Sequence, residues 1–148
     1  MMVLLDTNIL LRASDATHDQ YSVARAAIDR IVAAGKQPRL VPQVLYEFWV
    51  VATRPSDHNG LGITPAEVHA KVLQLRCGFE LLPDVPAIFD TWFELVSRHS
   101  VRGKPSHDAR LVAAMQVHGI TQILTFNGGD FARYPGIMVM TPDEVVTQ

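Results

Sequence analysis

The stretch Val3-Leu4-Leu5-Asp6-Thr7-Asn8-Ile9-Leu10-Leu11 decides the fold of this chain. Three apolar residues lead into a carboxylate and two small polar residues, and a second apolar run follows. This order predicts a short buried strand, a tight turn and then a helix. Asp6 would lie at the carboxyl end of the strand, where open parallel sheets bind their ligands. A purely structural role is equally open here, because Asp is also a good cap for a helix.

The rest of the chain continues to alternate helices with strands. Apolar residues at helical spacing and the usual start and stop residues predict helices over about 7–13, 18–34, from 42, 64–76, from 86 and 106–118. Short apolar runs predict further strands at 39–41, 79–82, 121–126 and 137–140. Such alternation predicts an α/β fold with a mainly parallel sheet. Right-handed crossovers would bring the carboxyl ends of its strands to one edge.

Composition bounds the class of protein. The chain has 148 residues, of which 48% are hydrophobic and 19% charged, so we expect one globular domain over 1–148. A net charge of −2 is not that of a protein that binds nucleic acid through bulk electrostatics, so any such role would need local cations or bound metal. The single cysteine, Cys77, excludes an internal disulfide and is expected to be buried. No apolar run could span a bilayer, and we expect a cytoplasmic protein.

Four carboxylates have positions that surface or turn roles do not readily explain. Asp6 ends a predicted buried strand, and Asp130 follows the strand that ends at Phe126. Glu47 lies on the apolar stripe of its helix, where an unpaired charge is costly and needs a partner. Asp108 heads the apolar stripe of another helix, although the helix dipole alone would also favour a carboxylate in that first turn.

A parallel sheet would bring these four carboxylates to the same edge. Two carboxylates about 4 Å apart repel by roughly 4 kcal/mol at an effective dielectric constant near 20. A shared proton can relieve one pair, but a divalent cation is the simpler answer for a larger cluster. Oxygen ligands select Mg²⁺ or Mn²⁺, which support the hydrolysis of phosphodiester bonds.

At this point the motifs resemble those of a known family. Asp6-Thr7-Asn8, Glu47 on a helix, Ser106-His107-Asp108-Ala109 and the segment Thr125 to Phe131 resemble the motifs of PIN-domain nucleases. The segments 52–55 and 59–62 are similar to those of VapC-type toxins from bacterial toxin–antitoxin pairs. The resemblance covers essentially the whole chain. It implies a three-layer α/β/α fold with a central, mainly parallel sheet flanked by helices.

The resemblance also implies an activity and partners. It implies an endoribonuclease that depends on Mg²⁺, with Mn²⁺ as a substitute, in which metal-activated water hydrolyses a phosphodiester bond of RNA. Family members act on tRNA or ribosomal RNA, form homodimers and are inhibited by a VapB-type antitoxin.

Residue by residue, the resemblance assigns a site. The implied catalytic residues are Asp6, Glu47, Asp108 and Asp130, with Asp6 and Asp108 the firmest metal ligands, then Asp130 and Glu47. Because the family often has an acid where this chain has Asn127, the fourth position lies between Asn127 and Asp130. Groups that would orient the metal ligands or the substrate are Thr7, Asn8, Thr125, Asn127 and Arg110. Cations that could hold the RNA backbone are Arg12, Arg54, Lys104, Arg110 and Arg133.

Two alternatives stay open. A metal-dependent small-molecule phosphatase of the haloacid dehalogenase kind also begins with a strand followed by Asp. That family needs a second Asp two residues later, where this chain has Asn8. A catalytically inactive RNA-binding PIN module is the other alternative, because Asn127 departs from the acidic pattern.

Overall fold

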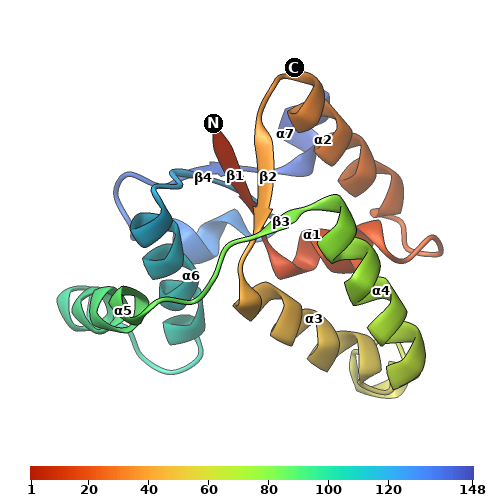
Figure 1. Ribbon diagram of the computed structural model, residues 1–148, viewed down its shortest axis with the longest axis horizontal. Helices are drawn as coiled ribbons and strands as arrows, with labels where there is room; N and C mark the ends of the chain where they lie inside the picture. Colours follow the sequence, from red (N-terminus) through yellow and green to blue (C-terminus); the bar gives the residue numbers. More distant parts are fainter.

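The computed structural model describes residues 1–148 and contains one five-stranded sheet surrounded by helices (Figure 1). The strands are β1 (Met2–Leu5), β2 (Gln37–Leu40), β3 (Glu80–Leu81), β4 (Gln122–Leu124) and β5 (Met138–Met140). The α-helices are α1 (Thr7–Ala13), α2 (Tyr21–Ala33), α3 (Pro42–Thr53), α4 (Pro65–Gly78), α5 (Pro86–Arg98), α6 (Pro105–His118) and α7 (Pro142–Val146). Two short 3₁₀ helices are η1 (Ser56–His58) and η2 (Gly128–Phe131).

All neighbouring strands of the sheet are parallel, in the order β3-β2-β1-β4-β5. The chain builds β2 and β3 on one side of β1 and then crosses over to build β4 and β5 on the other side. The strand order therefore reverses at β1, and such a switch point opens a crevice beyond the carboxyl ends of the strands. Asp6, the residue after β1, lies at this point.

The helices form a layer on each side of the sheet. Figure 1 shows α5 and α6 on one side and α1, α2 and α4 on the other. Both faces of the sheet are therefore covered, as parallel sheets require. This is the three-layer α/β/α arrangement that the sequence predicts.

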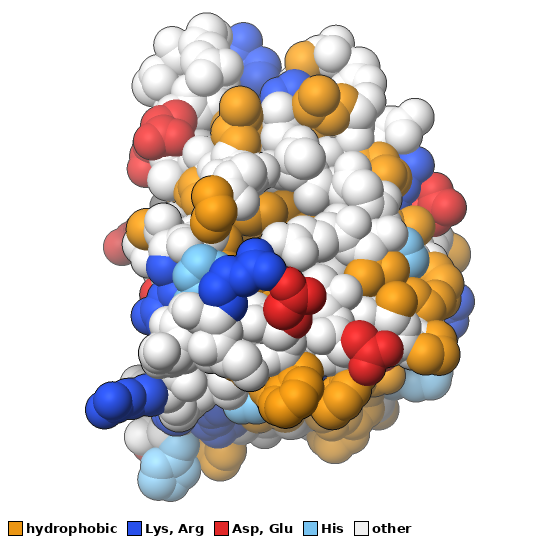
Figure 2. Space-filling view, turned by 90° about the vertical axis from the view of Figure 1, so that its left-hand side faces the viewer, with side chains coloured by type: hydrophobic (Ala, Val, Ile, Leu, Met, Phe, Trp, Pro, Cys, Tyr) orange, Lys and Arg blue, Asp and Glu red, His pale blue; other side chains and the backbone are white.

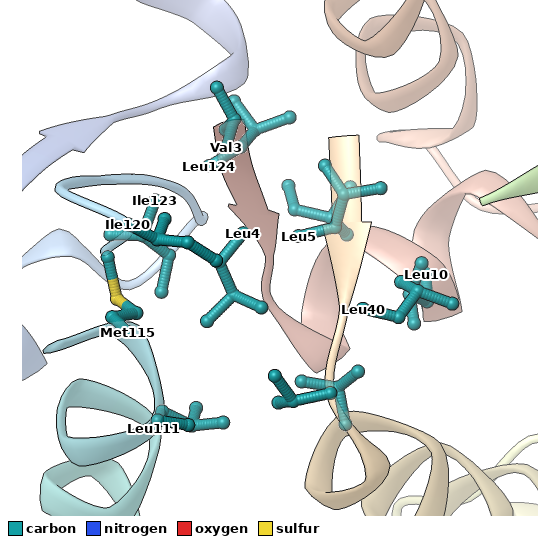
Figure 3. Close-up of a cluster of buried hydrophobic side chains, with 14 of the residues drawn as sticks. Val3, Leu4, Leu5, Leu10, Leu40, Leu111, Met115, Ile120, Ile123 and Leu124 are labelled. Atoms are coloured by element: carbon teal, nitrogen blue, oxygen red, sulfur yellow. The ribbon is translucent and has the colours of Figure 1, made fainter. Parts of the chain in front are cut away.

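The centre of the core lies around β1. Val3, Leu4 and Leu5 are fully buried, which explains why this strand reads as a continuous apolar run. Figure 3 shows Leu4 on the α6 side of β1, near Met115, and Leu5 on the opposite side. Burying a side chain such as leucine stabilises the fold by about 1.5–3 kcal/mol. The core therefore fixes the strand that carries Asp6.

Most element boundaries agree with the sequence pattern to within a few residues. Thr64 caps α4, because its Oγ1 accepts a hydrogen bond from the Glu67 N–H at 3.2 Å, and the helix begins where the sequence predicts. Strands β3, β4 and β5 are shorter than expected, and β4 covers only 122–124, whereas β2 begins two residues earlier than expected, at Gln37. The sequence interpretation missed α7, where Thr141 and Glu144 form a reciprocal cap.

The expectation that Cys77 is buried was wrong. Its side chain is exposed, because α4 fully buries only Val68 and presents Cys77 on its outward face. None of the helices has both the length and the apolar character that crossing a membrane would take.

Candidate functional site

Asp6 is buried, with only 7% of its surface exposed, and it has the two roles that the sequence left open. Its Oδ1 accepts a hydrogen bond from the Thr7 N–H at 2.8 Å and so caps α1. Its Oδ2 accepts from the Thr125 hydroxyl at 2.7 Å and from the Asn8 amide at 3.3 Å. The helix cap therefore holds the carboxylate at the carboxyl end of β1 and does not compete with a functional role there.

Thr125 and Asn8 join the ends of the two central strands. Leu5 lies opposite Leu124 in the β1–β4 pair, so the residues that follow each strand are neighbours in space. The Asn8 amide donates to the Thr125 hydroxyl at 3.2 Å, and its Oδ1 accepts from the Phe126 N–H at 3.1 Å. The Thr125 hydroxyl also accepts from the Asn127 N–H at 3.0 Å. This network fixes the floor of the site.

Replacing Thr125 by valine tests that network. The hydroxyl is fully buried and is replaced by a methyl group of similar size, which leaves the Asp6 carboxylate and the Asn127 N–H without this partner. We expect Thr125→Val to lower the free energy of unfolding by about 1–3 kcal/mol in a urea titration. Thr125→Ser keeps the hydroxyl and serves as the control. Equal stability of the valine variant and the wild type would show that the network does not hold the site.

Glu47 lies half-buried on α3, and its carboxylate accepts hydrogen bonds from two other side chains. Its Oε2 accepts from the Thr7 hydroxyl at 2.8 Å, and its Oε1 accepts from the Gln43 amide at 2.8 Å. The neighbouring Val44 and Phe48 are fully buried, as the apolar stripe predicts. The carboxylate on that stripe thus has the partners that its burial requires.

Asp108 and Asp130 complete the set of carboxylates. Asp108 lies half-buried in the first turn of α6, and Asp130 lies exposed in η2, after β4. Neither side chain accepts a hydrogen bond, and no Lys, Arg or His forms an ion pair with any of the four carboxylates. The site therefore concentrates negative charge without a neutralising side chain in contact.

The carboxylates act on one another electrostatically. Burial raises the pKa of Asp6, hydrogen bonds from Thr125 and Thr7 oppose this, and the charges of Glu47 and Asp130 raise the pKa further. Burial is also the main cause that raises the pKa of Asp108 to about 6. The charges of Asp130, Asp6 and Glu47 add to this effect on Asp108, and Arg133 opposes it. The four carboxylates predicted from the sequence thus face a common region.

The donor set of this region fits a hard divalent cation. It offers carboxylate oxygens, which Mg²⁺ and Mn²⁺ prefer. As the side chains stand, no three of them converge closely enough to surround one ion, so the closed cage that the sequence suggests is not preformed. Besides burial, the charges of neighbouring carboxylates help to raise the pKa values of Asp6 and Asp108, and a bound cation would offset these charges.

The structure brings some of the predicted supporting residues to the site and directs others elsewhere. Thr7, Asn8 and Thr125 contact the carboxylates, as the hydrogen bonds above show. Asn127 is exposed and only its backbone N–H bonds to this network. Arg110 pairs with Asp84 at 3.4 Å beside an apolar hollow on α5, and not with any of the four carboxylates.

Gln43 is a site residue that sequence reasoning missed. A signal was present, because Gln43 precedes Glu47 by four residues and therefore lies on the same helix face. A polar residue on the buried face of α3, one turn before a carboxylate, indicates a partner for that carboxylate.

Comparison with solved structures finds the same fold in toxin–antitoxin proteins. VapBC2 from Rickettsia felis, bound to a DNA fragment from their promoter, matches with a TM-score of 0.71 and 16% identity over 95% of this chain and 98% of that one. VapC20 from Mycobacterium tuberculosis, a sarcin-ricin loop cleaving toxin, matches with a TM-score of 0.65 and 20% identity over 88% and 93% of the two chains. A toxin–antitoxin complex from Klebsiella pneumoniae matches with a TM-score of 0.61 and 24% identity over 95% and 97%.

At these sequence identities, the similarity to solved structures supports the fold alone. The search of curated proteins returned no match. The sequence model of the PIN domain, however, matches residues 3–137, which include the four carboxylates and both central strands. The topology with its switch point at β1 agrees with that match. The chain therefore belongs to the PIN-domain family.

Proposed function

We propose that this chain is a divalent-metal-dependent endoribonuclease, the toxin of a pair with a VapB-type antitoxin, and that residues 1–148 form a single PIN domain that acts in the cytoplasm. The observation that carries the proposal is the group of four carboxylates, Asp6, Glu47, Asp108 and Asp130, at the carboxyl end of β1, where burial and the charges of neighbouring members raise the pKa values of Asp6 and Asp108. No cationic side chain pairs with them, so they are open to a metal ion.

The carboxylates and the hydroxyl groups of such a site would have different roles. Asp6 and Asp108 would hold the cation, with Glu47 and Asp130 beside them. A bound Mg²⁺ or Mn²⁺ supplies charge neutralisation for the scissile phosphate and activates water. For the fourth position we favour Asp130 over Asn127, because the charge of Asp130 reaches both Asp6 and Asp108. Thr7 and Thr125 keep the carboxylates oriented through their hydroxyl groups.

RNA would approach over the few cations near this acidic site. Arg133 is exposed, and its charge lowers the pKa of Asp108, so it lies within electrostatic reach of the carboxylates. Lys104 is exposed immediately before α6. Phosphate contacts of this kind position RNA without reading its sequence. The sarcin-ricin loop cleavage of VapC20 supports a folded RNA loop as the substrate.

Exposed apolar side chains support the proposed protein partners. Figure 2, which views the side where α5 lies, shows hydrophobic side chains gathered toward its lower and right-hand edges. Phe89 and Phe93 of α5 and Tyr46 and Val50 of α3 are each more than half exposed. Exposed apolar patches mark protein interfaces. They are consistent with a homodimer and with an antitoxin, and the VapBC complexes of the same fold support the latter.

The phosphatase alternative is less well supported. Its chemistry would need an acid at the position of Asn8. The Asn8 amide instead donates to Asp6 and Thr125, and its oxygen accepts from the Phe126 N–H. The side chain of Asn8 therefore links the ends of β1 and β4 and does not supply the acid that a phosphatase would need.

The test is an RNA cleavage assay with the purified protein. We expect structured RNA to be cut in Mg²⁺ or Mn²⁺ and to stay intact in EDTA, with no hydrolysis of a small phosphate ester. Cleavage that persists in EDTA would refute metal dependence. Hydrolysis of the ester without cleavage of RNA would favour the phosphatase. Binding of RNA without cleavage in either metal would favour the inactive PIN module.

A further inference from the structure

Gln43 is a buried polar residue that donates hydrogen bonds to the Glu47 side chain and to the backbone next to Asp108. It is the second residue of α3 and only 5% of its surface is exposed. Its Nε2 donates to Glu47 Oε1 at 2.8 Å and to the backbone carbonyl oxygen of His107, also at 2.8 Å. A side-chain amide nitrogen carries two hydrogen atoms, so both are used.

These two hydrogen bonds join α3 to α6 at the site. The His107 carbonyl belongs to the peptide group that leads into Asp108. One amide group therefore connects the Glu47 carboxylate to the backbone that carries Asp108. No other hydrogen bond links the two helices.

The orientation of the Gln43 amide is set by its two acceptors. Its Oε1 is buried and accepts no hydrogen bond from the protein. A buried acceptor without a partner costs about 1–3 kcal/mol. Turning the amide over would be worse, because Oε1 would then face the oxygens of Glu47 and His107. The amide group is thus held in the orientation that serves these two neighbours.

Glu47 is fixed from both sides by these contacts. The Thr7 hydroxyl holds Oε2 from α1, and Gln43 holds Oε1 from within α3. We propose that Gln43 is a positioning residue that sets the orientation of Glu47 and its separation from Asp108, and thereby the affinity of the site for a divalent cation. This inference rests on the proposed function. Partners that orient metal ligands are typically worth 10- to 100-fold in metal affinity.

The test measures Mn²⁺ binding to the whole protein by calorimetry, without RNA. Gln43→Met keeps the length of the side chain and removes both donors. We expect it to weaken Mn²⁺ binding by about 10-fold or more, and to lower kcat on RNA with little change in KM. Gln116→Met, at an exposed position of α6, is the matched control and should bind Mn²⁺ as the wild type does.

A double-mutant cycle separates positioning from general damage to the fold. If Gln43 acts through Glu47, adding Gln43→Met to Glu47→Gln should cause no further loss of Mn²⁺ affinity. The same loss in both backgrounds, or wild-type affinity in Gln43→Met alone, would overturn the inference. If Gln43→Met does not fold, Gln43→Ala replaces it, because the alanine side chain also removes both donors and adds no charge to the site. A wild type that binds no Mn²⁺ would instead refute the proposed function.

Discussion

Asp6→Asn is expected to reduce RNA cleavage by about 10³-fold or more while leaving the fold intact. The variant removes one negative charge from the buried end of β1, where the carboxylate is the best-oriented oxygen donor of the site. Loss of about 4 kcal/mol of metal-dependent stabilisation of the transition state corresponds to that factor. The asparagine oxygen can still accept from the Thr7 N–H, so α1 keeps its cap.

The measurement is single-turnover cleavage of RNA in Mg²⁺, together with circular dichroism to establish folding. Asp90→Asn provides a matched control, because Asp90 lies exposed on α5 and is not among the charges that act on Asp6 or Asp108. The control should cleave at the wild-type rate. Wild-type cleavage by a folded Asp6→Asn variant would mean that the chemistry takes place elsewhere in the molecule.

Asp108→Asn is expected to have opposite effects on activity and on stability. Its pKa of about 6 in the folded protein lies above the ordinary value of 3.8. The folded state therefore binds the proton more tightly than the unfolded state does. The stability linked to this group is present below pH 3.8 and is lost as the pH rises through about 6. Asparagine carries no charge, so the variant escapes this loss.

In EDTA at pH 7.5 we expect Asp108→Asn to be more stable than the wild type by roughly 1 kcal/mol, a value discounted because Asp108 is partly exposed to solvent. This corresponds to a rise in Tm of about 2–4 °C. The difference should vanish near pH 4. RNA cleavage should fall at least about 100-fold, because a neutral amide is a poor ligand for Mg²⁺.

Divalent cation should reverse the order of stability. A ligand at 100 times its Kd stabilises the folded state by about 2.7 kcal/mol, and the wild type would gain more than a variant that binds the ion weakly. Thermal melts across pH, with and without Mg²⁺, measure both effects. A variant that is less stable than the wild type in EDTA at pH 7.5 would show that the charge of Asp108 is compensated within the folded protein.

The fold and the main carboxylates could be predicted because their signals are local. The run Val3 to Leu5 followed by Asp6 encodes both a buried strand and its polar end. The apolar stripes that contain Glu47 and Asp108 follow from helical periodicity alone. Once the strands are parallel, the topology itself brings their carboxyl ends together.

Other features depend on tertiary contacts that no local pattern encodes. Gln43 contacts His107 across 64 residues, so its partner could not be read from its neighbours. Arg110 follows Asp108 closely in sequence, yet it pairs with Asp84 because α6 turns its side chain toward the loop before α5. The amphipathic pattern of α4 is weak, and the side on which Cys77 falls depends on how that helix packs.

The most direct test of a metal site between these carboxylates is a crystal of the protein soaked in Mn²⁺ and measured for anomalous scattering. We predict a peak within about 2.0–2.3 Å of carboxylate oxygens of both Asp6 and Asp108. The peak should be absent in Asp6→Asn. An Mn²⁺-soaked wild-type crystal without a peak at these residues, under conditions in which the protein cleaves RNA, would contradict the account.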